Sequence, residues 1–194
     1  MLELLVISGP SGVGKGTIIN RLISNHPTLS LAVSATTRQP RTGEVDGTHY
    51  YFMNDDEFDH AIQNELFIEW APVHQYRYGT LRREVLRIQN SGKLPLLEID
   101  TDGAMQVKKN FPNATLLFIE PPSLQSLIDR LYQRGTETDD QISRRVQVAQ
   151  IELSRKAYYN FVVVNDIVEN AVTSVLEIIE QLQQSSSSHL TTGD

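Results

Sequence analysis

The chain has 194 residues, of which 40% are hydrophobic and 21% charged, with no cysteine and a formal net charge of −7. This length suits one domain carrying inserted subdomains, and the lack of cysteine excludes disulfides and thiolate metal sites. An acidic chain argues against general nucleic-acid binding, so an anionic ligand would have to be held by local groups of Arg and Lys.

The first ten residues, MLELLVISGP, contain an acidic residue and too short an apolar run for a signal peptide. No apolar stretch approaches the roughly 18 residues of a membrane span. We therefore expect a cytoplasmic protein with neither a nucleic-acid nor a membrane partner.

Four short apolar runs predict strands that are buried on both faces of a parallel sheet. They are Leu2–Ile7, Leu94–Ile99, Thr115–Ile119 and Phe161–Asn165. Helical patterns separate these runs, which gives the strand–helix–strand order of an α/β domain.

The segment GPSGVGKGT, Gly9 to Thr17, follows the first run and precedes an apolar helical face. It matches the phosphate-binding pattern G-x-x-x-x-G-K-[ST] except that Gly16 replaces the usual Ser or Thr. Backbone N–H groups could still surround a polyphosphate, and Lys15 could reach its terminal oxygens. The missing hydroxyl affects metal binding, since Thr17 lies one position late. The alternative is a Gly-rich turn with an incidental lysine.

Residues 34–90 interrupt the alternation with mixed strand, turn and helix signals, including a helix cap at Asn54. Arg38 and Arg41 lie on either side of Pro40, and two arginines on a rigid turn suit a phosphate because guanidinium groups bind it bidentately. Taken in isolation, this segment favours the simpler interpretation of surface arginines beside a turn proline.

The second half of the chain continues with a helix predicted to be capped by Ser123, then a charged helical stretch broken at Gly135. The broken stretch, residues 129–155, is typical of a mobile lid. A closing amphipathic helix is predicted at Val172–Leu182, and residues 185–194 are a polar segment that we expect to be disordered.

Seven segments together resemble guanylate kinase, in the same order and at matching intervals: SATTRQPRTGEVDGTHYYF, FIEWAPV, YGT, LLEID, PPS, RGTET and VVVND. The resemblance covers about residues 3–182. It implies an α/β fold, a P-loop kinase core in which helices flank a parallel sheet of five strands. It also implies ATP-dependent phosphorylation of GMP or dGMP with Mg²⁺, a reaction of purine nucleotide metabolism.

The resemblance also divides the chain into parts. The core comprises residues 1–33, 91–128 and 156–184; an inserted mixed α/β GMP-binding subdomain comprises 34–90; the helical lid comprises 129–155; and the tail is 185–194.

The resemblance assigns site residues as well. The ATP site is expected at Gly9, Pro10, Ser11, Gly12, Val13, Gly14, Lys15, Gly16, Thr17 and Asn165. The GMP site is expected at Ser34, Arg38, Arg41, Glu44, Tyr50, Glu69, Tyr78, Thr80 and Asp100. The catalytic cations would be Lys15, Arg41, Arg134 and Arg145, and the metal ligands Thr17 and Asp100. Other lid charges, such as Arg130, we expect merely to be solvated.

The chemistry of guanine supports the match, because its N1–H and N2–H₂ donors lie beside the O6 acceptor. Glu69 could accept from both donors while Ser34 and Thr80 donate to O6, whereas adenine presents the reverse pattern. Taken alone, Glu69 could be an outward residue of an edge strand.

No general base is required, since a phosphate with a second pKa near 6 is mostly dianionic at neutral pH. We therefore assign no role to any of the five histidines.

Two segments depart from the family pattern. Asp102 replaces a frequent Gln, and its carboxylate could repel the GMP phosphate or help to hold the metal. QYRYG replaces GNYYG, so Arg77 could add to the anion site or point outward.

Two other functions remain open. A related kinase of ribose 1,5-bisphosphate would not need Glu69, and an inactive guanylate-kinase-like protein-binding module would typically have lost the P-loop that is intact here. The sequence leaves the oligomeric state open between monomer and homodimer.

Overall fold

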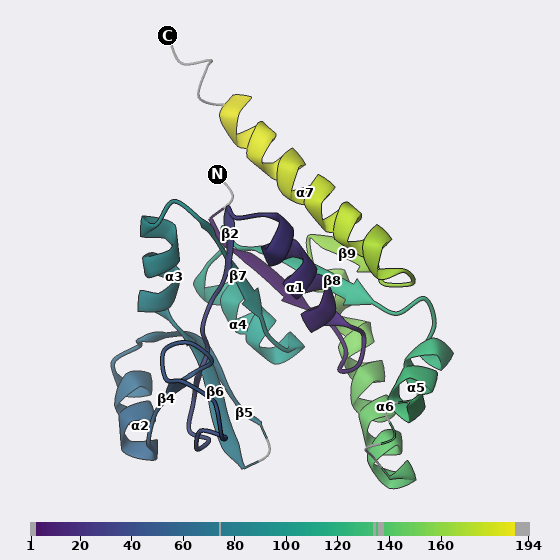
Figure 1. Ribbon diagram of the computed structural model, residues 1–194, viewed down its shortest axis with the longest axis horizontal. Coiled ribbons are helices and arrows are strands. Elements are labelled where there is room, and N and C mark those ends of the chain that lie inside the picture. Colours follow the sequence, from purple (N-terminus) through teal and green to yellow (C-terminus); the bar gives the residue numbers. More distant parts are fainter. Residues whose placement is uncertain (1–2, 74, 134, 136–137, 189–194) are drawn as a thin grey trace.

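The computed structural model describes residues 3–73, 75–133, 135 and 138–188, and the backbone alone for 185–188. A parallel sheet of five strands forms its core (Figure 1). In spatial order these are β2 (Leu29–Leu31), β7 (Leu94–Glu98), β1 (Leu5–Ser8), β8 (Thr115–Glu120) and β9 (Phe161–Val164). The expected α/β core is confirmed. The apolar runs used to predict strands did not include β2, because this strand is only three residues long.

Helices cover both faces of this sheet. α1 (Lys15–Asn25) and α7 (Val168–Ser188) pack on one face, and α3 (Arg82–Asn90) and α4 (Thr101–Asn110) pack on the other. Successive strand residues point to opposite faces, so Leu5 and Ile7 join the first cluster while Leu4 and Val6 join the second. This two-sided burial explains why the runs are apolar almost throughout.

A second, mixed sheet lies within residues 34–90. Its strands, in spatial order, are β4 (Tyr51–Phe52), β3 (Ala35–Thr36), β6 (Tyr76–Leu81) and β5 (Phe67–Val73). The adjoining helix α2 (Asp55–Gln63) begins with a reciprocal capping box between Asn54 and Glu57, as the sequence predicted. Phe58 of α2 is fully buried against this sheet.

Two further helices, α5 (Leu124–Gln133) and α6 (Asp139–Ser154), lie side by side beyond the edge of the central sheet, and a short 3₁₀ helix η1 (Arg155–Tyr158) follows (Figure 1). The predicted cap at Ser123 is present, since its Oγ accepts from the N–H of Ser126 at 3.1 Å. α6 and the second half of α5 fall within residues 129–155, the range predicted for the lid, while the first half of α5 precedes it.

The end of the chain differs from expectation. α7 starts before the predicted closing helix and continues to Ser188, so residues 185–188 are helical although we placed the disordered tail from 185. The segment QQSSSS contains no Gly or Pro that would stop a helix, which allows the backbone hydrogen bonds to continue. The remaining tail residues, 189–194, lie outside the described residues.

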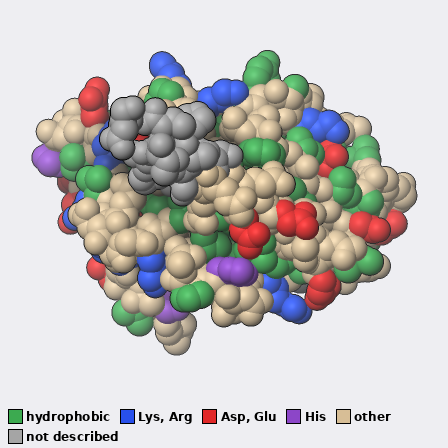
Figure 2. Space-filling model, turned by 90° about the horizontal axis from the view of Figure 1, so that it is seen from above, with side chains coloured by type: hydrophobic (Ala, Val, Ile, Leu, Met, Phe, Trp, Pro, Cys, Tyr) green, Lys and Arg blue, Asp and Glu red, His purple; other side chains and the backbone are tan. Residues whose placement is uncertain are grey.

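None of the described helices combines the length and the apolar character needed to cross a membrane. On the face seen in Figure 2, acidic and basic side chains are interspersed over the part that the structure describes, without a continuous basic area.

Candidate active site

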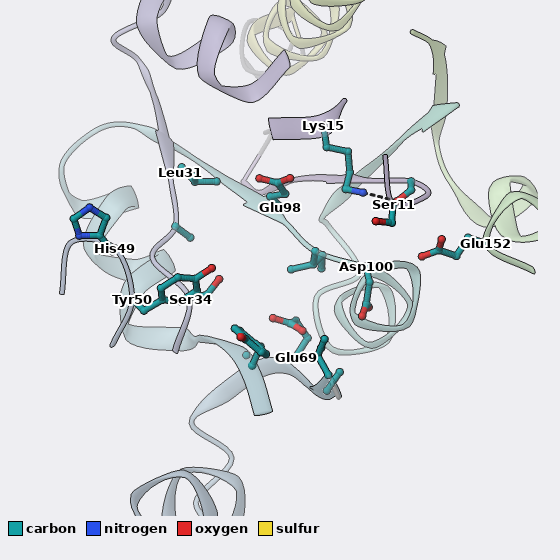
Figure 3. A pocket seen from close by; sticks show the side chains of 17 residues that line it. Ser11, Lys15, Leu31, Ser34, His49, Tyr50, Glu69, Glu98, Asp100 and Glu152 are labelled. Atoms are coloured by element: carbon teal, nitrogen blue, oxygen red, sulfur yellow. Dashed lines mark hydrogen bonds between the residues drawn. The ribbon is translucent and has the colours of Figure 1, made fainter. Parts of the chain in front are cut away.

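A cavity of about 510 Å³ lies between the P-loop, the second sheet and α6 (Figure 3). Residues expected for both nucleotides line it: Gly9, Ser11, Lys15, Ser34, Tyr50, Glu69, Tyr78 and Asp100. They come from segments far apart in the sequence, so folding brings the two predicted half-sites together in one space.

The P-loop needs its glycines for steric reasons. Gly9 has φ 142°, and a Cβ there would lie 2.2 Å from the carbonyl oxygen of Ile119. Gly14 has φ 98°, and a Cβ there would meet the Asn165 amide at 2.6 Å. Gly14 is also the N-cap of α1 and makes no side-chain cap hydrogen bond, so the first N–H groups of the helix are available to an anion.

Lys15 points into the loop. Its Nζ donates to the carbonyl oxygens of Gly9 at 2.5 Å and Pro10 at 3.2 Å. Burial lowers the pKa of Lys15, while the nearby carboxylates of Glu152, Glu98 and Asp100 raise it. The ammonium group is thus held by weak neutral acceptors that a phosphate would replace.

Asn165 lies behind the P-loop. Its side chain is buried, and Nδ2 donates to the Val13 carbonyl at 2.7 Å. Arg130 donates to the same Val13 carbonyl at 3.2 Å and to the Asn165 carbonyl at 2.8 Å. Our expectation that Arg130 is a merely solvated lid charge was wrong, because this partner is 117 residues away in the sequence.

Glu69 faces the cavity and is only 5% exposed, so it is not an outward residue of an edge strand. One carboxylate oxygen accepts from the Thr80 hydroxyl at 2.7 Å. Burial raises the pKa of Glu69 to about 7; Asp100 adds to the rise and the Thr80 hydrogen bonds oppose it. Asp100 caps α4, with Oδ1 accepting from the Gly103 N–H at 2.7 Å.

Arg38 and Arg41 line a second cavity of about 380 Å³, together with Val73, Gln75, Tyr76 and Tyr78. Glu44 binds Arg38 through both oxygens, at 2.8 and 2.9 Å, and accepts from the Arg41 backbone N–H at 2.7 Å. These hydrogen bonds, that of Arg38 first, lower the pKa of Glu44 to about 2. Glu44 therefore orients the Arg38 guanidinium and holds the Arg41 backbone, and it lies outside both cavity linings. The Arg38 guanidinium also lies 5.3 Å from the Tyr50 ring centre.

The sequence did not single out two of the cavity's carboxylates. Glu98 lies two residues before Asp100 in the LLEID segment, and burial raises its pKa while Lys15 lowers it. Glu152 comes from α6; burial raises its pKa too, opposed by Lys15 and by the Ser11 N–H. The LLEID motif could have indicated Glu98, but no local signal marks Glu152.

The remaining predicted residues differ in how the structure places them. Arg145 of α6 reaches the P-loop, with Nη1 at 3.5 Å from Ser11 Oγ, whereas Arg134 lies outside the described residues. Thr17 is exposed on α1. Over the described parts of the chain, no three histidine or acidic side chains cluster so as to hold a metal ion by themselves.

His49, which we assigned no role, lines the cavity, and its Nδ1 accepts from the Val45 N–H at 3.0 Å.

The two departures from the family pattern have structural partners. Asp102 forms an ion pair with Arg155 of η1 and does not line the cavity. Arg77 is paired with Asp55, at 2.6 Å, and with Asp59, so it fastens β6 to α2. Neither side chain faces the cavity, so neither adds charge to its lining.

Comparisons with known proteins agree with this geometry. A family model described as guanylate kinase matches residues 1–182. The chain is 47% identical over 176 residues to a guanylate kinase of Caldanaerobacter subterraneus subsp. tengcongensis, covering 91% of this chain and 85% of the relative. It is 45% identical over 177 residues to a guanylate kinase of Thermobifida fusca, covering 91% and 90%. The crystal structure of guanylate kinase from Anaplasma phagocytophilum superposes with a TM-score of 0.73 at 31% identity, covering 94% and 86%.

Over nearly its whole length, in sequence and in fold, the chain belongs to the guanylate kinase family.

Proposed function

We propose that this protein transfers the γ-phosphoryl group of ATP to GMP or dGMP, producing ADP and GDP or dGDP. The observation that carries the proposal is the buried carboxylate of Glu69, which opens into the same cavity as Lys15 of the P-loop. A buried carboxylate matches the paired N–H donors of guanine, and a P-loop lysine matches a polyphosphate.

The base-binding end of the cavity would hold guanine. Glu69 accepts from the base N1–H and N2–H₂, Ser34 donates to O6, and Asp100 contributes a further acceptor. Thr80, expected from the sequence to donate to O6, instead donates its hydroxyl to Glu69 and would hold that carboxylate in place. Because Glu69 is almost fully buried, a base with donors and acceptors reversed would leave it unpaired, at a large cost in free energy. This arrangement accounts for a preference for GMP over AMP.

The phosphate of GMP would lie near Arg38, Arg41, Tyr50 and Tyr78, with Glu44 orienting the Arg38 guanidinium and binding the Arg41 backbone N–H. The P-loop, Gly9 to Thr17, would hold ATP, with Asn165 supporting the loop from behind. In this assignment residues 34–90 bind GMP, residues 129–155 act as the lid, and all of these groups come from a single chain.

Transfer then depends on positioning and on neutralising charge between two phosphates. Lys15 and Arg41 approach from the P-loop and the inserted region. Arg145 approaches from α6, close to Ser11. Arg134 would be the second lid cation, a role that rests on its position in the sequence.

We propose Mg²⁺ as the metal that accompanies ATP. This ion prefers oxygen ligands and binds through one or two carboxylates together with water and substrate phosphates. Glu98 and Asp100 offer such oxygens in the cavity beside Lys15, which fits that preference, whereas the predicted ligand Thr17 is exposed and does not line the cavity. When bound, Mg²⁺ would neutralise the β- and γ-phosphates.

Two alternatives fit less well. Ribose 1,5-bisphosphate has no base to pair with Glu69, and an inactive protein-binding module has no need of the intact P-loop. The reaction would take place in the cytoplasm, where both nucleotides are available.

The test is ADP formation from ATP with GMP, dGMP, AMP, UMP or ribose 1,5-bisphosphate as acceptor. We expect turnover with GMP and dGMP only, and a KM for GMP raised about tenfold or more in Glu69→Gln. Glu180→Gln, an exposed residue of α7, is the matched control and should behave as wild type. Equal turnover of AMP and GMP would contradict the base assignment, and no turnover with any acceptor would favour the binding module.

A further inference from the structure

A carboxylate outside the cavity lies at the junction between the central sheet and the inserted region. Glu84 is in the first turn of α3, and its side chain is 0% exposed. A charged group at such depth needs partners, because an unpaired buried charge is strongly unfavourable. It does not line the cavity, and the roles proposed above do not use it.

Both oxygens of Glu84 are fully engaged. Oε1 accepts from the Val33 backbone N–H at 3.0 Å and from Arg87 Nη2 at 2.8 Å. Oε2 accepts from the Tyr51 hydroxyl at 2.9 Å and from Arg87 Nε at 2.8 Å. Burial raises the pKa of Glu84, but the hydrogen bonds from Arg87, Val33 and Tyr51 outweigh it and lower the pKa overall, which favours the ionised form.

The partners of Glu84 matter because of their neighbours in the chain. Val33 directly precedes Ser34, and Tyr51 directly follows Tyr50. Ser34 and Tyr50 both line the cavity (Figure 3). A backbone hydrogen bond of 2.9 Å from the Tyr51 N–H to the Ser34 carbonyl joins the two segments. One buried carboxylate therefore holds both backbone segments that present these two side chains.

We propose that Glu84 is a positioning residue for the acceptor nucleotide, acting through Val33 and Tyr51 to hold Ser34 and Tyr50 in their binding positions. The proposal rests on the function proposed above and extends it to a residue that does not touch the substrate. Arg87, whose side chain is 58% exposed, closes the network on its solvent side.

Tyr51→Phe and Glu84→Gln test this role. Tyr51→Phe removes one hydroxyl and keeps the ring, so folding should be preserved; Glu84→Gln keeps the shape and removes the charge. The matched control is Tyr158→Phe, which removes a hydroxyl from an exposed tyrosine of η1, outside the proposed lid. For each protein, calorimetry gives the Kd for GMP and for ATP separately, and steady-state rates give kcat and both KM values.

We expect the Kd and KM for GMP to rise about threefold in Tyr51→Phe and about tenfold in Glu84→Gln, because hydrogen bonds to a charged group are lost. The ATP constants and kcat should stay within about twofold of wild type, and the double variant should be less than additive because the two residues share one contact.

Unchanged GMP constants in both variants, even with a lower melting temperature, would overturn the proposal and leave Glu84 a purely structural role. Equal weakening of GMP and ATP binding would overturn it as well, since that pattern indicates general loosening. A wild-type protein that neither binds nor phosphorylates GMP would instead refute the proposed function itself.

Discussion

At Gly103, a single methyl group would disturb the base-binding end of the cavity. A Cβ there would lie 2.7 Å from Oε2 of Glu69 and 3.4 Å from Oδ1 of Asp100. Gly103 has an ordinary helical position in α4, so the backbone does not require glycine. The requirement comes from the close approach of Glu69.

We therefore expect Gly103→Ala to raise the KM for GMP about tenfold, because the Glu69 carboxylate must move from its position against Thr80. Stability should change little, since alanine is favoured over glycine in a helix by about 1 kcal/mol and this offsets part of the crowding. Steady-state kinetics with GMP varied, and with ATP varied as the internal control, checks this. An unchanged KM for GMP would show that the carboxylate is free to shift.

The raised pKa of Glu69, about 7, predicts a pH dependence. The pKa of Glu69 in the folded protein lies above the ordinary value of 4.5. Its contribution to the free energy of unfolding is therefore fully present below pH 4.5 and is lost as the pH rises through 7. Guanine binding needs the ionised carboxylate, so affinity should fall by up to about tenfold per pH unit below 7.

Calorimetry with guanosine between pH 6 and 8 measures this effect without the titration of the GMP phosphate. In Glu69→Gln the dependence should disappear, leaving uniformly weak binding. If the variant keeps the wild-type slope, another group is responsible.

Among the secondary-structure elements, Arg77 connects α2 to the second sheet. Its guanidinium pairs with Asp55 and Asp59, and lies 4.7 Å from the ring centre of Phe58. Both acidic partners are more than half exposed, so solvent screens the ion pairs and most of the stabilisation comes from packing on the ring.

We expect Arg77→Ala to lower the free energy of unfolding by about 1 kcal/mol, measured by urea denaturation. Lys109→Ala, an exposed residue of α4, serves as the control and should change it by less than about 0.5 kcal/mol. A loss as small as that of the control would mean that α2 is held by its apolar face alone.

At this scale the parallel sheet also explains where the site forms. The P-loop follows β1, Glu98 and Asp100 lie at the end of β7, and Asn165 follows β9. Parallel strands place their carboxyl ends at one edge, which is where ligands bind in open α/β sheets. The parallel arrangement therefore brings these three segments together at one edge of the sheet.

In the whole molecule, two ligand sites share one folded chain, so each ligand should stabilise it by mass action. A ligand at about 100 times its Kd contributes about 2.7 kcal/mol, which corresponds to a rise in Tm of roughly 5–10 °C for a chain of this size. GMP alone and ATP alone should each produce such a shift in thermal unfolding.

The variant Lys15→Ala tests whether the ATP site and the GMP site stabilise the protein independently. We expect it to lose most of the shift caused by ATP and to keep the shift caused by GMP, because Lys15 lies in the P-loop and Glu69 is untouched. Loss of both shifts to the same extent would mean that the two half-sites are not independent in the free protein.

The sequence by itself determined the parts whose evidence is local. The P-loop is a contiguous pattern between a strand and a helix, α2 has its own capping box, and the buried strands are apolar runs. The inserted region was recognisable through contiguous motifs, which supplied Arg38, Arg41 and Glu69. Local hydrogen bonding, capping and two-sided burial impose these patterns on neighbouring residues, so they can be read without the fold.

Only the tertiary structure decided which side chains support the site from a distance. Arg130 reaches Val13 across 117 residues, Glu84 reaches Val33 across 51, and Glu152 approaches Lys15 from α6. Gly103 matters because β5 brings Glu69 against α4. Each of these contacts joins elements whose spacing along the chain carries no periodic signal, and their energies depend on burial that exists only after the sheet, the inserted region and α6 have packed together.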